Sequence, residues 1–238
     1  MNGLIFLPDR NTKRDKKTGK LKPDYTGAFL PEAIAFSKHH SIESSNIVEV
    51  DVSLRRRDMR NFICDKIKEH ESPLDVVAFF CHGLKNSIQL GFSVHNLSML
   101  IDAMESRVMP DVVIALFCCS AARDLDSEIQ DDKSVNVISG DGGFADTFRD
   151  LLCKKTNAID CRVVAHVTAG HTTINPWVKY FDGNGSKTGG YGGKWLVEPK
   201  SRLWKKWIRV LKNKNSLLRY RYLFYSIARV RMELEGKK

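Results

Sequence analysis

A histidine and a cysteine in this chain each lie at the end of a short apolar run, and together they could carry out nucleophilic catalysis. The apolar run at 75–80 leads to His82 and Gly83, and the apolar run at 112–117 leads to Cys119. A free thiol is only a few per cent thiolate near neutral pH, and a nearby imidazole can accept its proton or stabilise the thiolate. We therefore expect His82 to act as a general base and Cys119 as the nucleophile of an acyl transfer, most simply the hydrolysis of a peptide bond.

Backbone amides beside these side chains could stabilise the oxyanion that such a reaction forms. Gly83 has no Cβ, so its N–H can approach a substrate carbonyl closely. Together with the N–H of Cys119 it would form an oxyanion hole. The alternative is purely structural, because cysteine is among the most buried residue types and a Cys at a strand end can serve core packing alone.

Both apolar runs predict buried strands that would hold these residues at one edge of a sheet. The runs are rich in Val, Ile and Phe and are stopped by Gly or Ser, which suits parallel strands covered on both faces. The carboxyl ends of such strands lie side by side, and ligands bind at this edge of open α/β sheets. A third apolar segment at 162–165 predicts another central strand, and the alternation of strands with helices predicts an α/β fold.

The two strand ends resemble those of the caspase-like cysteine peptidases, a group that includes caspases, metacaspases and the bacterial CHAT-type proteases. In that group one strand ends in His-Gly, as at 80–83 here, and the next core strand ends in the nucleophilic Cys, as at 116–120. The resemblance covers about residues 1–180 and is closest to small bacterial or phage caspase-like proteins. Further stretches that resemble the family are a first strand at 3–7, the entry to a first helix at 26–33, a second strand at 47–52, a helix at 57–69, and the segments 141–148 and 166–173.

This resemblance implies a caspase-like three-layer sandwich with a mostly parallel central sheet, and a cysteine endopeptidase that acts on protein or peptide substrates through a Cys-His dyad without a cofactor. Successive side chains of a strand point to opposite faces, so only one of Cys118 and Cys119 can face the cleft. Matching the motif end to end places Cys119 there and Cys118 in the core. The caspase sequence Gln-Ala-Cys-Arg-Gly is absent, so specificity for Asp is not carried over.

Four residues are candidates for substrate binding: Asp9, Phe117, Asp141 and His171. In several relatives the residue two before the nucleophile lines the specificity pocket, and that position is Phe117 here. Asp141, together with Asp146, could act as a pocket acid that favours Lys or Arg at the cleaved position. His171 lies in a Gly-His-Thr-Thr turn and is expected to line the cleft.

Three further histidines, His39, His40 and His166, are expected to have no chemical role. His166 is expected to pack in the core. The pair His39 and His40 is expected to be solvated at the end of the first helix, where imidazoles favour the negative end of the helix dipole.

The cysteine pattern bears on metal binding and on compartment. The six cysteines include no Cys-x-x-Cys pair, and a zinc site needs three or four converging ligands, so we expect no metal. Adjacent cysteines in core strands suit a disulfide framework poorly, so the thiols are expected to be reduced. The first apolar run follows no basic region, and no run reaches about 18 apolar residues. We therefore expect no signal peptide, no spanning helix and a cytoplasmic location.

Charge divides the chain into a peptidase-like domain at 1–198 and a basic C-terminal extension at 199–238. Residues 200–238 hold 13 Lys and Arg against two Glu, a balance of +11, which leaves the first 199 residues at −1 of the total of +10. Apolar residues recur at helical spacing at 203–211, the run breaks at 213–216, and a second apolar-rich segment follows at 217–234. The sequence therefore predicts a basic amphipathic helical extension.

This extension can be interpreted in three ways. It can be a helical hairpin docked on the domain with its Lys and Arg in water. It can be a membrane-surface helix, since Trp lies beside Lys and Arg. It can also present a face that binds nucleic acid or another partner. The last two interpretations belong to an alternative function, that of a catalytically inactive interaction module.

Two loops are candidates for access and regulation. The loop at 123–143 follows the nucleophile and is rich in Asp, and the corresponding loop of caspase relatives is often cleaved or rearranged on activation. We therefore expect it to control access to Cys119. The Lys-rich loop at 10–24 could admit an acidic or extended substrate. A nucleotide-binding α/β protein is disfavoured, because no suitable glycine pattern follows a strand and opens a helix.

Overall fold

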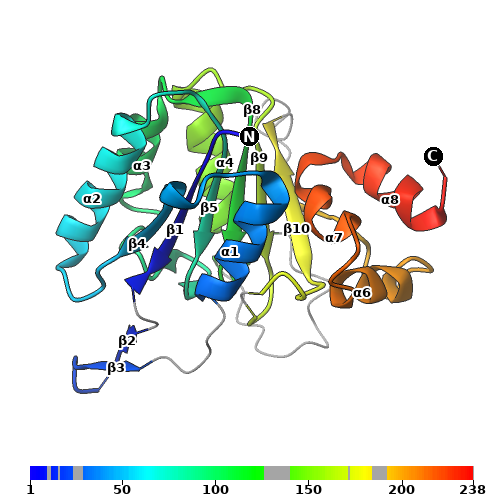
Figure 1. Cartoon of the computed structure of the whole chain (residues 1–238), viewed down its shortest axis with the longest axis horizontal. Coiled ribbons are helices and arrows are strands. Elements are labelled where there is room, and N and C mark those ends of the chain that lie inside the picture. Colours follow the sequence, from blue (N-terminus) through cyan, green and yellow to red (C-terminus); the bar gives the residue numbers. More distant parts are fainter. Residues whose placement is uncertain are drawn as a thin grey trace.

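The computed structural model describes residues 1–9, 12–15, 17–23, 29–125, 140–170, 172–183 and 192–237. Within this part of the chain, a seven-stranded sheet forms the centre of the molecule, in the order β11-β10-β9-β8-β5-β1-β4 (Figure 1). Its strands are β1 (Gly3–Pro8), β4 (Ile47–Val50), β5 (Leu74–Phe80), β8 (Val108–Phe117), β9 (Arg162–His166), β10 (Val178–Asp182) and β11 (Lys194–Trp195).

The sheet is mostly parallel, as the apolar runs predict. Strands β4, β1, β5, β8 and β9 pair in parallel, and β10 pairs antiparallel with both β9 and β11. The carboxyl-terminal half of β8 and nearly all of β5 are buried, because helices cover them on both sides. This burial explains why these strands read as continuous apolar runs instead of alternating polar and apolar residues.

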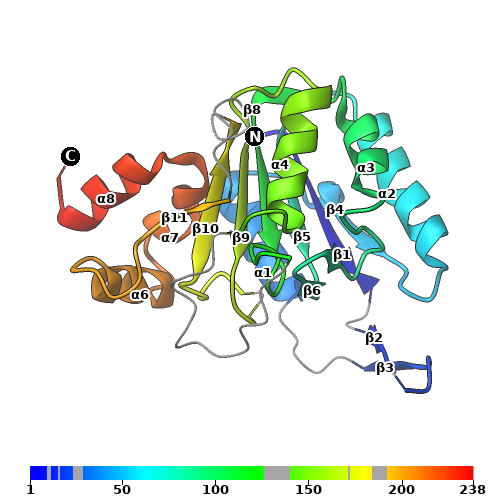
Figure 2. The ribbon, with the colours of Figure 1, turned by 180° about the vertical axis from the view of Figure 1, so that it is seen from behind.

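Helices form a layer on each face of the sheet, which gives three layers (Figures 1 and 2). One face is covered by α2 (Arg56–Glu69), α3 (Leu97–Met104) and α4 (Phe144–Lys155). The opposite face is covered by α1 (Phe29–His40) and by helices from the C-terminal extension. We call these the α2–α4 face and the α1 face.

The C-terminal extension is helical, as predicted, and shares a hydrophobic cluster with the sheet. Its elements are α6 (Trp204–Lys212), α7 (Leu218–Arg221), the 3-10 helix η4 (Tyr222–Phe224) and α8 (Ile227–Glu235). Helix α6 ends just before the predicted break at 213–216. Trp207, Leu211 and Tyr222 are buried in the same cluster as residues of β1, β5 and β8.

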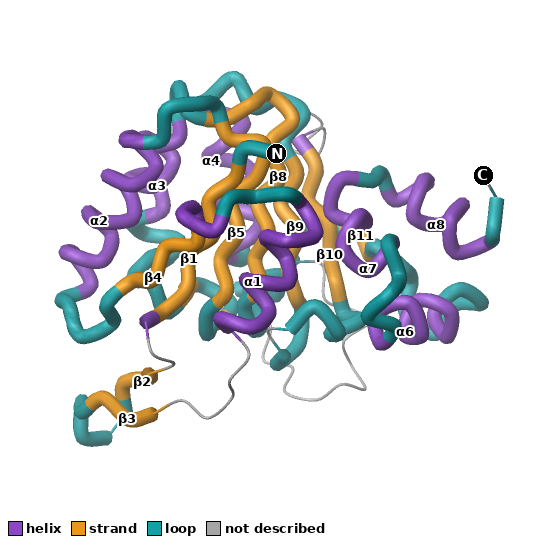
Figure 3. The backbone as a smooth tube through the Cα atoms, in the orientation of Figure 1, coloured by secondary structure: helices purple, strands orange, loops and turns teal. Residues whose placement is uncertain are grey.

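Short elements lie outside the main sheet. The hairpin of β2 (Thr12–Arg14) and β3 (Leu21–Pro23) stands apart from it in Figure 3. The others are the hairpin of β6 (Gly83–Leu84) and β7 (Ser87–Ile88) and the 3-10 helix η2 (Ser44–Asn46). The β6–β7 hairpin directly follows β5, so it extends from the carboxyl edge of the sheet. Among the described residues, no helix is both long and apolar enough to cross a bilayer.

Candidate active site

The carboxyl ends of β5 and β8 lie side by side in the middle of the sheet. Their parallel register pairs Phe80 with Phe117, the last residue of each strand. The residues that follow the two strands also lie side by side, since the Sγ atoms of Cys81 and Cys118 are 3.4 Å apart. His82 and Cys119 each come one residue after these cysteines, so both lie at the carboxyl edge of the sheet.

His82 lies on the α1 face at this edge. Its ring packs edge-on against Phe29 of α1, with the ring centroids 5.1 Å apart. Gln89 forms two hydrogen bonds with the backbone of His82. The N–H of His82 donates to Gln89 Oε1 at 3.2 Å, and the N–H of Gln89 donates to the His82 carbonyl at 2.8 Å. The imidazole is half-buried, so it is both held in place and reachable from solvent.

Gly83 lies against the backbone of the candidate nucleophile. A Cβ at this position would lie 2.7 Å from the carbonyl oxygen of Cys119 and 2.8 Å from Cβ of Cys118. Contacts this short are not tolerated, so a side chain at residue 83 would push the two strand ends apart. The structure thus explains the glycine by close approach of the His82 loop to the Cys119 loop.

Three backbone N–H groups act on the half-buried thiol of Cys119. The N–H of Gly170 donates to its Sγ at 3.2 Å. Burial raises the pKa of Cys119, and hydrogen bonds from the N–H groups of Gly170, Gly83 and Cys119 itself oppose that rise. Converging backbone donors of this kind stabilise negative charge on a thiolate or on an oxyanion.

Ser120 holds a strained conformation immediately after Cys119. Its φ of 57° lies in the left-handed region, which non-glycine residues rarely adopt. Two hydrogen bonds fix this turn to the chain after β9: Ser120 N–H donates to the Thr168 carbonyl at 3.2 Å, and Ala122 N–H donates to the His166 carbonyl at 3.0 Å. Backbone strain of this kind is concentrated at functional sites.

Gly170 and Asn175 were not identified from the sequence, although they shape the thiol environment. Gly170 has a φ of +124°, and the buried Asn175 donates from Nδ2 to its carbonyl at 2.7 Å. Asn175 Oδ1 in turn accepts from the N–H of Trp177 at 3.1 Å. The sequence feature that could have identified Gly170 is its position a few residues after the strand at 162–166, just as Gly83 comes a few residues after β5.

A buried polar cluster connects the C-terminal extension to both sides of this edge. Arg219 donates from Nη2 to the hydroxyl of Thr173 at 2.7 Å, and Thr173 donates to Glu32 Oε2 at 2.6 Å. Glu32 lies one helical turn after Phe29, which contacts His82, and Thr173 lies three residues after Gly170, which contacts Cys119. The extension therefore braces the two segments that hold the candidate residues.

Cys118 and His166 are buried in the core, as predicted. Cys118 is wholly buried beside Cys81, and burial raises the pKa of its thiol well above the usual value. His166 is 2% exposed, and its ring lies 5.8 Å from that of Phe117. Neither side chain is available to a substrate.

Two residues predicted to line the substrate pocket, Phe117 and Asp146, are instead buried in the core. Phe117 is 3% exposed and stacks on Phe80 at 4.4 Å, because its position in β8 directs it under α1. Asp146 is 3% exposed and forms an ion pair with Arg149 at 2.6 Å, so it cannot pair with a substrate cation. Burial raises the pKa of Asp146, and the guanidinium of Arg149 opposes that rise.

Asp9 and Asp141 each form a hydrogen bond with another loop. Asp9 accepts a hydrogen bond from the N–H of Val52 at 3.0 Å and so connects the end of β1 to the loop after β4. Asp141 is exposed, and its N–H donates to Asp124 Oδ1 at 2.9 Å. His171 and residues 126–139 of the Asp-rich loop lie outside the described residues.

The prediction that His39 and His40 are solvated is wrong for His40. The ring of His40 lies 4.4 Å from that of Phe36, one turn earlier in α1, and 5.1 Å from that of Phe224, because the C-terminal extension covers the end of the helix. Burial, with the charges of His39, Arg221 and the N-terminal amino group, lowers the pKa of His40 to about 4. His39 stacks on Tyr220 at 4.4 Å. The contacts with Phe224 and Tyr220 come from residues about 180 positions away in the sequence, so helix-end reasoning could not foresee them.

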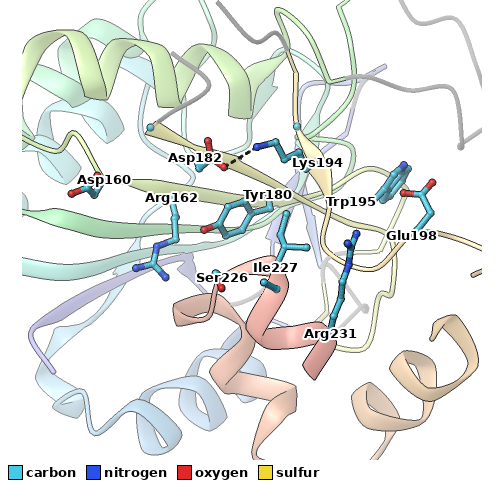
Figure 4. Close-up of a pocket in the computed structure, with 13 residues that line it drawn as sticks. Asp160, Arg162, Tyr180, Asp182, Lys194, Trp195, Glu198, Ser226, Ile227 and Arg231 are labelled. Carbon is cyan, nitrogen blue, oxygen red and sulfur yellow. Dashed lines mark hydrogen bonds and ion pairs between the residues drawn. The ribbon is translucent and has the colours of Figure 1, made fainter. Parts of the chain in front are cut away.

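A cavity of about 850 Å³ lies elsewhere, between the β9–β10–β11 side of the sheet and α8 (Figure 4). Its lining includes charges of both signs and two aromatic rings, and Lys194 is paired with Asp182 at 3.3 Å. Neither His82 nor Cys119 lines it, so we do not assign it to the dyad. Among the described residues, no group of three or more His, Cys, Asp or Glu side chains could hold a metal ion.

Comparison of the chain with protein-family models, with curated proteins and with solved structures finds no match. Function is therefore inferred from the residues of this chain.

Proposed function

We propose that this protein is a cysteine endopeptidase of caspase-like fold. The observation that carries the proposal is the convergence of backbone N–H donors on the Cys119 thiol, which follows β8, next to the end of β5, after which His82 and Gly83 come. The three layers and the mostly parallel sheet agree with the fold that the sequence resemblance implies. The strained Ser120 adds a feature typical of active sites.

The proposed reaction is acyl transfer through a thioester. Cys119 Sγ attacks the carbonyl carbon of the scissile peptide while its proton passes to His82. The N–H groups of Gly83 and Cys119 donate to the oxyanion, and His82 then protonates the departing amine. Water, activated by the neutral imidazole, hydrolyses the thioester and restores the thiol.

The raised pKa of Cys119 bears on how the nucleophile is activated. Burial raises the pKa of this thiol, so a base that accepts its proton as Sγ bonds to the carbonyl carbon would favour attack. His82, which follows the adjacent strand end, is the base that we propose. A thiolate pre-formed in the free protein is not required by this mechanism.

The test is labelling with a panel of peptidyl chloromethyl ketones, followed by mass spectrometry to locate the adduct. We expect an adduct on Cys119 in the wild type, none in Cys119→Ala, and a strongly reduced labelling rate in His82→Ala. Cys118→Ala is the matched control, since it removes the neighbouring thiol and is expected to label normally. An adduct on Cys118, or labelling that is unaffected by His82→Ala, would contradict the dyad and favour an interaction module without activity.

A further inference from the structure

One exposed face of α6 carries three cations in line. Lys205, Arg209 and Lys212 are separated by four and three residues, so they share one side of the helix, about 6 Å and about 4.5 Å apart along its axis. All three are exposed, whereas Trp207 and Leu211 on the opposite side are wholly buried. We call Lys205, Arg209 and Lys212 the basic face.

The basic face is not neutralised by neighbouring carboxylates. Both glutamates of the extension are already paired: Glu233 with Arg229 at 2.7 Å, and Glu235 with Lys237 at 2.8 Å and with Arg202. Within the described residues, no carboxylate lies within 4.0 Å of a cationic nitrogen of the basic face. Its charge is therefore available to an external anion.

The orientation of α6 argues against insertion into a membrane. An interfacial helix buries its apolar side among lipid chains. Here that side is occupied: Trp207 donates from Nε1 to the Pro176 carbonyl at 3.0 Å, and Trp204 packs on Trp177 at 4.9 Å. The tryptophans that suggested a membrane helix thus hold α6 against the sheet.

The same packing makes the basic face rigid and directs it outward. Helix α6 lies at the periphery of the molecule, beside α7 and α8 (Figure 1). Lys206 donates to the Leu234 carbonyl at 3.2 Å, so α6 is also attached to the end of α8. A row of cations on a fixed helix meets a regularly spaced polyanion without first having to be ordered.

We infer that the basic face binds the phosphate backbone of nucleic acid, without reading its sequence. Duplex DNA carries one negative charge per about 1.7 Å of its axis, so several phosphates lie within reach of three cations spread over about 10 Å of helix. Phosphate contacts of this kind position a protein on nucleic acid but carry no base specificity. This binding is independent of the proposed peptidase activity.

The test measures binding of a fluorescein-labelled DNA duplex of about 20 base pairs by anisotropy, between about 50 and 200 mM salt. The variant is Lys205→Gln/Arg209→Gln/Lys212→Gln. The matched control is Arg55→Gln/Arg56→Gln/Arg57→Gln, which removes the same charge from an exposed cluster at the start of α2. We expect the variant to lose at least about tenfold in affinity at low salt, and the slope of log K against log salt to fall by about 2.7.

Three results would overturn the inference. They are equal losses in the variant and its control, no binding of the duplex by the wild type at low salt, and wild-type binding to phosphatidylserine vesicles that is tighter than binding to the duplex. Unchanged thermal unfolding of the variant shows that its fold is intact. Duplex binding by Cys119→Ala is expected to equal that of the wild type, so failure of the peptidase proposal and failure of this one can be told apart.

Discussion

At the carboxyl ends of β5 and β8, the two faces of the sheet carry residues with opposite properties. Towards the α2–α4 face lie Cys81 and Cys118, which are wholly buried among apolar side chains. His82 and Cys119 are half-buried: His82 packs against Phe29 of α1, and backbone N–H groups donate to the Cys119 thiol. A single residue along each strand separates the two pairs. Position on a face, and not residue type, thus decides which thiol is accessible.

The largest expected effect comes from placing a side chain at Gly83, where the segments after β5 and β8 are in close contact. In Gly83→Ala, the new Cβ would lie 2.7 Å from the Cys119 carbonyl oxygen, so the Gly83 N–H would move away from the oxyanion. Since loss of one oxyanion donor costs about 100- to 1000-fold in rate, we expect a fall of that size in kcat. The measurement is turnover of a peptide substrate found in the labelling panel. Leu84→Ala, at an exposed neighbouring residue, is the control, and equal rates in both variants would contradict the oxyanion role.

The next effect concerns a buried imidazole on the α1 face. The pKa of His40 is lowered to about 4 in the folded protein, against about 6.5 in the unfolded chain. Between those values the unfolded state binds the proton and the folded state does not, so the free energy of unfolding falls as the pH is lowered from about 6.5 to about 4, by up to about 3 kcal/mol. Urea unfolding across this range tests the slope.

The His40→Phe variant sharpens this test. Phenylalanine suits a site between Phe36 and Phe224, and it cannot be protonated. We expect the variant to lose most of the pH slope in this window, while His95→Phe, at an exposed histidine, keeps it. A slope that survives in His40→Phe would assign the pH dependence to other groups.

A smaller effect is expected from the polar brace of the C-terminal extension. Arg219→Met leaves the buried Thr173 without its donor and Glu32 without its counter-charge, so we expect the free energy of unfolding to fall by about 2 kcal/mol. We also expect slower labelling of Cys119, because the brace holds both flanking segments. Arg221→Met, at an exposed arginine two residues away, is the control, and the comparison fails if the two variants are equally stable.

The smallest effect belongs to the α2–α4 face. Cys118→Ala removes one buried sulfur atom and leaves a small cavity, so we expect a loss of about 1 kcal/mol in unfolding free energy. Labelling of Cys119 is expected to be unchanged. A large loss of labelling in Cys118→Ala would mean that the two faces are not independent at the strand ends.

Local patterns in the sequence were enough to predict β5, β8 and β9, the mostly parallel sheet and the helical C-terminal extension, but not β10 and β11. Apolar runs at 75–80 and 112–117 indicate buried strands because their length and composition are local properties. Alternation along a strand likewise separates Cys118 from Cys119, since side-chain direction has a period of two residues. These features needed no knowledge of distant contacts.

Only the tertiary structure decided which groups surround the candidate dyad. Gly170, 51 residues further along the chain, contacts Cys119 and is itself held by Asn175, and Arg219 reaches Thr173 from the extension. Burial of His40 and Phe117 likewise depends on helices that pack against them. Such contacts join residues with no local relationship in the sequence, so the sequence by itself determined the elements and the reactive residue types, and packing of distant segments determined their environment.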